Sequence, residues 1–142
     1  MRTNTAATLY NRYVSGGSDK YQRTAIIACE WENQKASAVV KSGLLTADSA
    51  VIYIPFSIGA NYLKPIAWRA AKTGKWTLAV GDVLVKGLVL DEIHDAVVGP
   101  PAVPAFTLTM LKAAHDDCIT IKSVDTFDMG SASMRHWKVS GS

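Results

Sequence analysis

The sequence is poor in charged residues and has no strong excess of either sign. Charged residues make up 19% of the 142 positions, below the ~25% of an average soluble domain. Fifteen Lys and Arg against twelve Asp and Glu give a net charge of +3, and no run of three basic residues occurs. Because binding to a nucleic-acid backbone needs a clustered basic patch, we expect no specific nucleic-acid binding. Low charge with 49% apolar residues fits either a well-packed monomer or a chain partly covered by partners.

Cysteine is also scarce, and long apolar runs are missing. Cys29 and Cys118 each lie in an apolar, strand-like stretch. The alternatives are a disulfide and two buried free thiols, and we expect the thiols. Residues 1–5 lack the apolar region of a signal peptide, and no apolar stretch reaches the ~18–20 residues that span a bilayer. We therefore expect a protein made in a reducing cytoplasm, without membrane association.

No motif of catalysis or metal binding occurs in the sequence. His94, His115 and His136 follow one another at intervals of 21 residues, which match no zinc or iron motif. Ser131 and Ser133 follow Gly130 in a turn, without the Gly-x-Ser-x-Gly elbow of a nucleophilic serine. No phosphate-binding glycine pattern is present either. We expect no enzymatic activity, no metal and no cofactor.

What the sequence does contain is a β pattern over the length of a single domain, residues 1–142. The closing segment predicts a hairpin. Alternating residues of its first strand are Ile119, Ile121 and Val124, those of its second strand are Met134, His136 or Trp137, and Val139, and Gly130 lies in the turn between them. Further strands are predicted over 7–14, 21–31, 50–56, 76–80, 83–87 and 88–93. Pro65 could take the first helical position of a short helical turn or loop over 65–71. A short helix is predicted over 106–116, with Thr107 as its cap and Met110, Leu111 and Ala114 on one face. Six to eight short strands without internal repeats predict a mainly β fold, a small antiparallel β-barrel or sandwich with one or two short helices and a long loop.

Residues 32–50 interrupt this pattern. Residues 32–45 have a mixed helix and loop composition, and Gly43 is a plausible helix stop. The segment could equally be a long excursion between strands. We therefore treat 32–50 as a candidate projecting loop or helix.

The aromatic residues are the remaining candidates for recognition. Trp31, Trp76 and Trp137 are expected in the core, where they would bury large areas. Trp68 lies beside Arg69 in a predicted loop or helical turn, where an interface anchor and a core residue are both open. With Tyr62, these two residues form the candidate interface.

Segments spread along nearly the whole chain carry a resemblance to a known family. They are Thr8-Leu9-Tyr10-Asn11-Arg12-Tyr13, Tyr21-Gln22-Arg23-Thr24, Trp31-Glu32-Asn33, Val51-Ile52-Tyr53-Ile54-Pro55-Phe56, Trp76-Thr77-Leu78, Gly81-Asp82-Val83-Leu84-Val85-Lys86-Gly87, Ser123-Val124-Asp125 and His136-Trp137-Lys138-Val139. Together they resemble a family of small proteins encoded in the structural modules of tailed phages and prophages of Gram-positive bacteria, among minor capsid and head–tail connector genes.

The resemblance implies a structural role in the virion neck. Small β-barrel proteins of such modules serve as head-completion (stopper) proteins, which form a homo-oligomeric ring below the portal and adaptor proteins. A loop in the channel retains DNA, without binding it specifically, until the tail proteins join. By length and composition, 32–50 is the candidate for that segment, with Lys35, Lys41, Ser42, Gly43 and Leu44 as candidate channel residues.

Two other functions stay open at the level of the sequence. A tail terminator or tail-completion protein of the same neck would show a more α+β pattern. A ligand- or carbohydrate-binding β domain would use exposed aromatics near Asp or Asn, and Asn61, Tyr62 and Trp68 are the residues that could serve.

Overall fold

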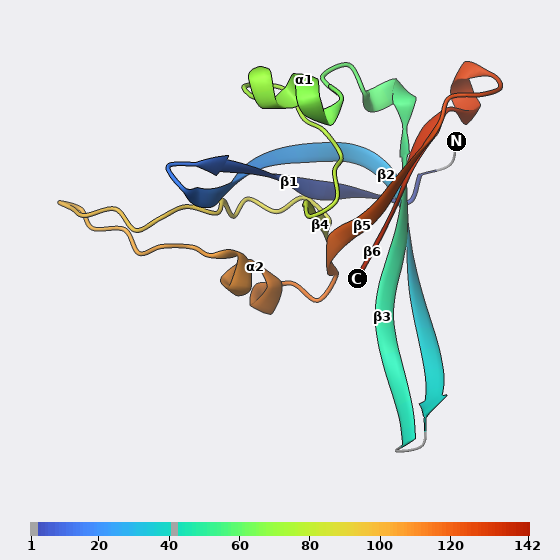
Figure 1. The fold of residues 1–142 in the computed structure, drawn as a ribbon, viewed down its shortest axis with the longest axis horizontal. Helices are drawn as coiled ribbons and strands as arrows, with labels where there is room; N and C mark the ends of the chain where they lie inside the picture. Colours follow the sequence, from blue (N-terminus) through green and yellow to red (C-terminus); the bar gives the residue numbers. More distant parts are fainter. Residues whose placement is uncertain (1–2, 41–42) are drawn as a thin grey trace.

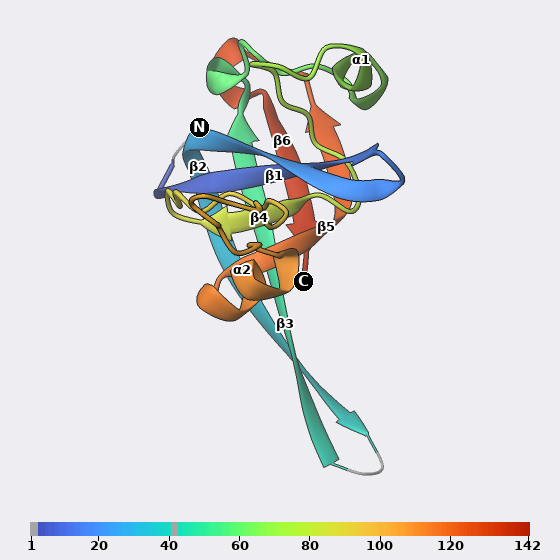
Figure 2. The same cartoon turned by 90° about the vertical axis from the view of Figure 1, so that its left-hand side faces the viewer.

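Six antiparallel strands close into a barrel in the order β1-β2-β3-β6-β5-β4. The structure is a computed structural model that describes residues 3–40 and 43–142, with the side chains of residues 34–48 also outside the description. The strands are β1 (Thr5–Ser15), β2 (Ser18–Val40), β3 (Gly43–Pro55), β4 (Val83–Lys86), β5 (Cys118–Phe127) and β6 (His136–Gly141); the helices are α1 (Pro65–Ala70) and α2 (Leu108–Ala114), with 3₁₀ turns at Phe56–Ile58 and Ala132–Met134. The predicted mainly β fold with short helices is confirmed (Figures 1 and 2).

The chain builds the barrel from two three-strand meanders. The first joins β1, β2 and β3, and the second joins β4, β5 and β6. Pairing of β3 with β6 and of β1 with β4 then closes the ring. Two residues, Gly16 and Gly17, connect β1 to β2, with φ of 60° and 78°. Positive φ at both central residues is what a two-residue hairpin of this kind requires, which explains the Gly-Gly pair.

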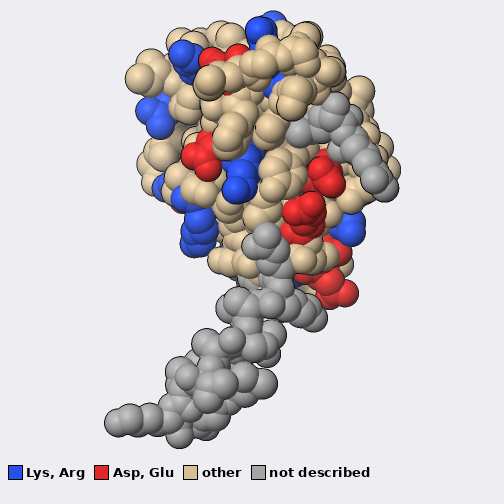
Figure 3. Space-filling model, turned by 90° about the vertical axis from the view of Figure 1, so that its right-hand side faces the viewer, with Lys and Arg blue, Asp and Glu red and all other residues tan. Residues whose placement is uncertain are grey.

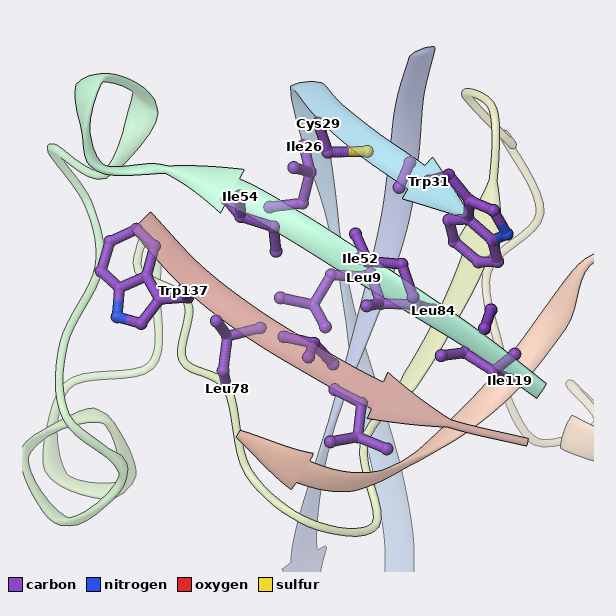
Figure 4. Packing of buried hydrophobic residues seen from close by; sticks show 14 of the residues in the cluster. Leu9, Ile26, Cys29, Trp31, Ile52, Ile54, Leu78, Leu84, Ile119 and Trp137 are labelled. Carbon is purple, nitrogen blue, oxygen red and sulfur yellow. The ribbon is translucent and has the colours of Figure 1, made fainter. Parts of the chain in front are cut away.

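The barrel interior is filled by side chains from every strand and from one irregular segment. Figure 4 shows Leu9, Ile52 and Leu84 close together at the centre of this cluster, with Trp137 and Ile119 toward its two ends. Alternate residues face inward along β6, where Trp137, Val139 and Gly141 are buried. The predicted closing hairpin and the core positions of Trp31, Trp76 and Trp137 are therefore confirmed, whereas Met134 is 65% exposed and outside the core.

A second cluster covers the outer face of β1 and β4. Tyr10, Val83 and Val85 point outward from the barrel but are buried beneath Val89 and Leu111, the latter on α2. Both faces of these two strands are thus covered. This explains why residues 7–14 lack the alternation that is typical of a half-exposed strand.

The predicted strands at 76–80 and 88–93 are wrong. Residues 76–80 form only a bridge between Tyr62 and Trp76, and the side chains of Trp76 and Leu78 fill the core without forming a ladder. Residues 88–93 lead irregularly away from β4. Of the two alternatives for 65–71 the helical turn forms, as α1 with Pro65 at its start. The helix predicted over 106–116 forms as α2, where the Thr107 hydroxyl accepts a hydrogen bond from Met110 N at 3.2 Å. On α2 only Leu111 is buried, so the expected face with Met110 and Ala114 does not form.

Candidate functional site: projecting segments on a small barrel

The longest feature that leaves the barrel is a hairpin formed by the ends of β2 and β3. β3 pairs with β6 only as far as Ala50, opposite Gly141, and the pairing of β2 with β1 ends at Cys29. From Gln34 opposite Ser49 to Val40 opposite Gly43, β2 and β3 pair only with each other. We call residues 34–40 and 43–49 the hairpin arm. Seven paired positions at ~3.3 Å per residue give it a length of about 23 Å. Figures 1 and 2 show the two strands leaving the barrel together.

The hairpin arm corrects the expectation of a helix or loop over 32–50. The composition that suggested a helix belongs to two strands that pair with each other in an unbroken register. Among the candidate channel residues, Lys35 lies opposite Asp48, Gly43 opposite Val40, and Leu44 opposite Val39. Lys41 and Ser42 lie outside the described residues.

The base of the hairpin arm is acidic on one side. A cavity of about 310 Å³ there is lined by Asn33, Asp116 and Asp117, among others, and Asn33 Nδ2 donates to Asp117 Oδ1 at 3.4 Å. Figure 3 shows acidic side chains gathered close to the point where the arm leaves the molecule. This surface disfavours the close approach of a polyanion.

The three residues of the candidate interface have different environments. Trp68 is 2% exposed, and its Nε1 donates to the Lys75 carbonyl at 3.0 Å, so the core alternative holds and an exposed anchor does not. Tyr62 is half-buried against Trp76 and Trp137, with ring centroids 5.3 Å and 4.4 Å away. Only Arg69 is exposed. The structure therefore does not bring these residues together as one open aromatic surface.

Arg69 instead contributes to a surface that the sequence analysis missed. A cavity of about 440 Å³ beside α1 is lined by Arg12, Arg69 and Lys72 and by apolar side chains that include Val14 and Val80. Val14 and Val80 are 66% and 67% exposed. We call these five residues the basic face. It could have been found from charge order, because residues 49–81 contain four Lys and Arg and no Asp or Glu.

A buried carboxylate supports the basic face from beneath. Asp82 is 2% exposed and accepts hydrogen bonds from Asn11 Nδ2 at 2.8 Å, Arg12 N at 2.9 Å and Ala79 N at 3.0 Å. Burial raises the pKa of Asp82, and these hydrogen bonds oppose the rise. Asn11 also donates to the Thr77 carbonyl at 2.7 Å. The network fixes the crossing segment 76–82 on β1.

A second projecting segment consists of residues 91–106, which we call the proline loop. Two antiparallel bridges, His94 with Phe106 and Val97 with Val103, fold it back on itself, with backbone hydrogen bonds of 2.8–3.0 Å. Figure 1 shows it running away from the barrel beside the β1–β2 hairpin. Its ten residues 96–105 are all Ala, Val, Gly or Pro, and Val98 at the tip is 95% exposed.

The base of the proline loop is acidic and anchored. Residues 87–111 contain three acidic residues, Asp91, Glu92 and Asp95, and no Lys or Arg. Asp95 forms an ion pair with Lys20, and Asp91 Oδ2 lies 3.4 Å from His115 Nε2. The Asp91 carbonyl accepts a hydrogen bond from the Tyr10 hydroxyl at 2.6 Å, and burial raises the pKa of that hydroxyl to about 12. The loop therefore starts from a fixed position on the barrel.

The histidines and cysteines make ordinary packing and hydrogen-bond contacts, and Cys118 lines the cavity at the base of the hairpin arm. His136 donates from Nδ1 to the Met134 carbonyl at 2.8 Å and stacks on Phe127. Cys29 is buried and Cys118 half-buried, and both are free thiols, as expected. Within residues 3–40 and 43–142, no group of three or more His, Cys, Asp or Glu could hold a metal ion. No helix in that part of the chain is long and apolar enough to cross a membrane.

Comparison with protein families gives one match. A family model described as a family of unknown function (DUF6751) matches residues 2–142. Comparisons with curated proteins and with solved structures give no match.

Proposed function

The chain belongs to DUF6751, a family of unknown function, and we propose that it is a structural subunit of a phage virion neck. In this role it is a head-completion (stopper) protein, not an enzyme. It forms a homo-oligomeric ring between the portal and adaptor proteins and the tail proteins, in the neck of a virion assembled in the host cytoplasm. The proposal starts from the resemblance of segments along the chain to proteins of head–tail connector modules.

The hairpin arm is the observation that carries the proposal. A ring protein that retains DNA needs a slender element that reaches from a rigid body into the channel. The arm extends about 23 Å from a barrel whose own ladders end at its base. Its two strands pair with each other over the whole of residues 34–40 and 43–49, and the outward-facing backbone groups of each strand face solvent or a neighbouring molecule.

The charge near the arm is consistent with a channel through which DNA passes. Attraction to phosphates rises with the number of cations that contact them. Residues 34–49 contain Lys35, Lys41 and Asp48 as their only charged positions. Asp116 and Asp117 lie at the base. The weak charge favours a physical obstruction that does not hold DNA tightly.

The mainly β architecture also supports the stopper role over the tail terminator, for which a more α+β pattern is expected. The ligand-binding alternative loses support because Trp68 is buried and Tyr62 packs against two tryptophans.

Shortening the hairpin arm tests the proposal. Replacing residues 36–47 by Asn-Gly joins Lys35 to Asp48, which lie opposite each other, through a favoured two-residue turn. A milder variant replaces residues 38–45 and joins Ser37 to Thr46 in the same way. We expect both proteins to fold and to join the neck, and heads assembled with them to lose DNA before tail joining, the shorter arm losing more.

The readout is the DNA content of tailless heads after nuclease treatment. Heads that keep a full genome with the shorter arm would rule out the retaining role. The fold of each variant is checked by circular dichroism, and incorporation into heads by quantitative mass spectrometry, so that a missing subunit is not mistaken for an open channel.

A further inference from the structure

We propose that neighbouring copies of this chain associate by docking the proline loop of one copy onto the basic face of the next. The inference rests on the proposed ring and names the contact that holds it together. It starts from the two exposed apolar surfaces outside the hairpin arm that carry charge of opposite sign. Because every copy of the chain carries both the proline loop and the basic face, a second copy can supply the partner surface for either one.

The proline loop has the properties of an inserting element. Val97 and Val98 are 53% and 95% exposed, with no charged or hydrogen-bonding side chain anywhere in residues 96–105. Prolines at positions 100, 101 and 104 restrict the backbone, and the bridge between Val97 and Val103 closes it. A loop already held in one conformation gives up little entropy when it binds. Exposed apolar tips of this kind mark contact sites.

The basic face has the complementary properties. Its cavity of about 440 Å³ is hollow enough to receive a loop tip and is walled in part by Val14 and Val80. Arg69 is exposed, and no ion pair of Arg69 occurs in the part of the chain that the structure describes. Lys72 is held in place, since its Nζ donates to the Arg69 carbonyl at 2.8 Å and lies 5.4 Å from the centre of the Tyr13 ring.

Charge distinguishes a second copy from other occupants. The basic face carries Arg12, Arg69 and Lys72, with buried Asp82 also lining its cavity, and Arg12 is already paired with Asp19. On the proline loop, Asp95 is paired with Lys20 and Asp91 lies beside His115. In the part of the chain that the structure describes, Arg69 and Lys72 on the face and Glu92 on the loop are therefore charges that make no ion pair. With the loop laid along the face, Glu92 comes beside Arg69 and Lys72. An anionic membrane or DNA would instead be repelled by the base of the loop. Because loop and face are different patches, successive copies can join head to tail, and such a contact gives a ring when the rotation between neighbours closes.

The experiment uses the purified full-length chain and measures self-association by sedimentation velocity over a range of concentrations. Val98→Asp places a charge at the loop tip, and we expect it to raise the dissociation constant about 30-fold or more, as for a central contact residue. Met129→Asp is the matched control, because Met129 is 83% exposed but lies in the connection between β5 and β6. We expect it to associate like the parent protein.

Charge exchange supplies a second, independent measurement. Arg69→Glu and Glu92→Lys each place like charges opposite one another, and we expect each to weaken association roughly fivefold. The double variant restores opposite signs and should return to within about twofold of the parent. Both side chains are exposed, so these variants are expected to fold even if Val98→Asp does not.

Each outcome decides the question. Loss of association in both single charge variants with recovery in the double variant supports the contact. A parent chain that stays monomeric at every concentration overturns it, and so does association that neither the loop nor the face variants change. Because the assay contains no portal, adaptor or DNA, its failure is separate from failure of the DNA-retention test.

Discussion

Replacing Asp82 with alanine tests how the crossing segment 76–82 is held on the barrel. The substitution removes the acceptor of three hydrogen bonds, from Asn11 Nδ2, Arg12 N and Ala79 N. Each buried donor left without a partner costs about 1–3 kcal/mol. Removing a carboxylate that is 2% exposed offsets part of this loss, since burial disfavours its charged form. We expect a net loss of about 3 kcal/mol in the free energy of unfolding.

The assay is urea denaturation at pH 7, followed by tryptophan fluorescence and circular dichroism. Trp76, which opens the crossing segment, makes the fluorescence sensitive to it. Asp128→Asn is the control, because Asp128 is exposed, and its stability should stay within about 0.5 kcal/mol of the parent. A loss of less than about 1 kcal/mol for Asp82→Ala would refute the view that this carboxylate fixes the segment.

The pH dependence of stability provides an internal check. The folded pKa of Asp82 is raised, so the folded state holds this proton more tightly than the unfolded state does. Its contribution to stability is therefore fully present below the unfolded value of about 3.9 and is lost as pH rises through the folded pKa. Asp82→Asn removes this titration. We expect the advantage of the parent over Asp82→Asn to shrink as pH rises through that window, and an advantage that grows would contradict the assignment.

Two further predictions concern the barrel itself. Burial raises the pKa of the Cys29 thiol to about 11, so at pH 8 we expect only half-buried Cys118 to react with a thiol reagent in the folded protein, and equal rapid reaction of both thiols would contradict this. The raised pKa of Cys29 also predicts that stability falls between about pH 9 and pH 11. Cys29→Ala should reduce this fall without abolishing it, because the pKa values of Tyr10 and Cys118 are raised as well. Gly141→Ala places a Cβ 2.2 Å from the Thr120 carbonyl oxygen. Thermal unfolding should show that the free energy of unfolding falls by about 1–3 kcal/mol relative to the control Ser142→Ala, which changes an exposed position. Unchanged stability would show that β5 and β6 can separate freely.

The sequence was informative wherever one face of a strand meets the core. Alternation predicted the closing hairpin because β6 buries Trp137 and Val139 on one side only. Pro65 and Thr107 indicated where the two helices begin, because proline at a first helical position and a threonine cap act locally and do not depend on the rest of the fold. Where apolar residues fill the core without forming a half-exposed strand, the same pattern gave a wrong prediction. Residues 76–80 are rich in strand formers because they fill the barrel end, and no neighbouring strand is available to pair with them.

The candidate site was harder to predict, for a different physical reason. Residues 34–48 have a mixed helix and loop composition. In the arm, β2 and β3 pair only with each other and lie away from the core, so neither strand needs alternating apolar and polar residues there. The sequence did not decide whether Trp68 is a core residue or an interface residue. Its burial depends on contacts with the Lys75 carbonyl and the Tyr13 ring, and no pattern in the sequence indicates those contacts. The basic face and the proline loop could have been found from the separation of charge between residues 49–81 and 87–111.

The most direct test of the proposed neck role is the mass of the particles that this chain forms, alone and together with the portal and adaptor proteins that the proposal names as its partners. Native mass spectrometry of the mixture measures both. The account predicts a closed ring of identical subunits that joins the portal–adaptor complex as one layer. A strict monomer that never joins that complex would contradict it.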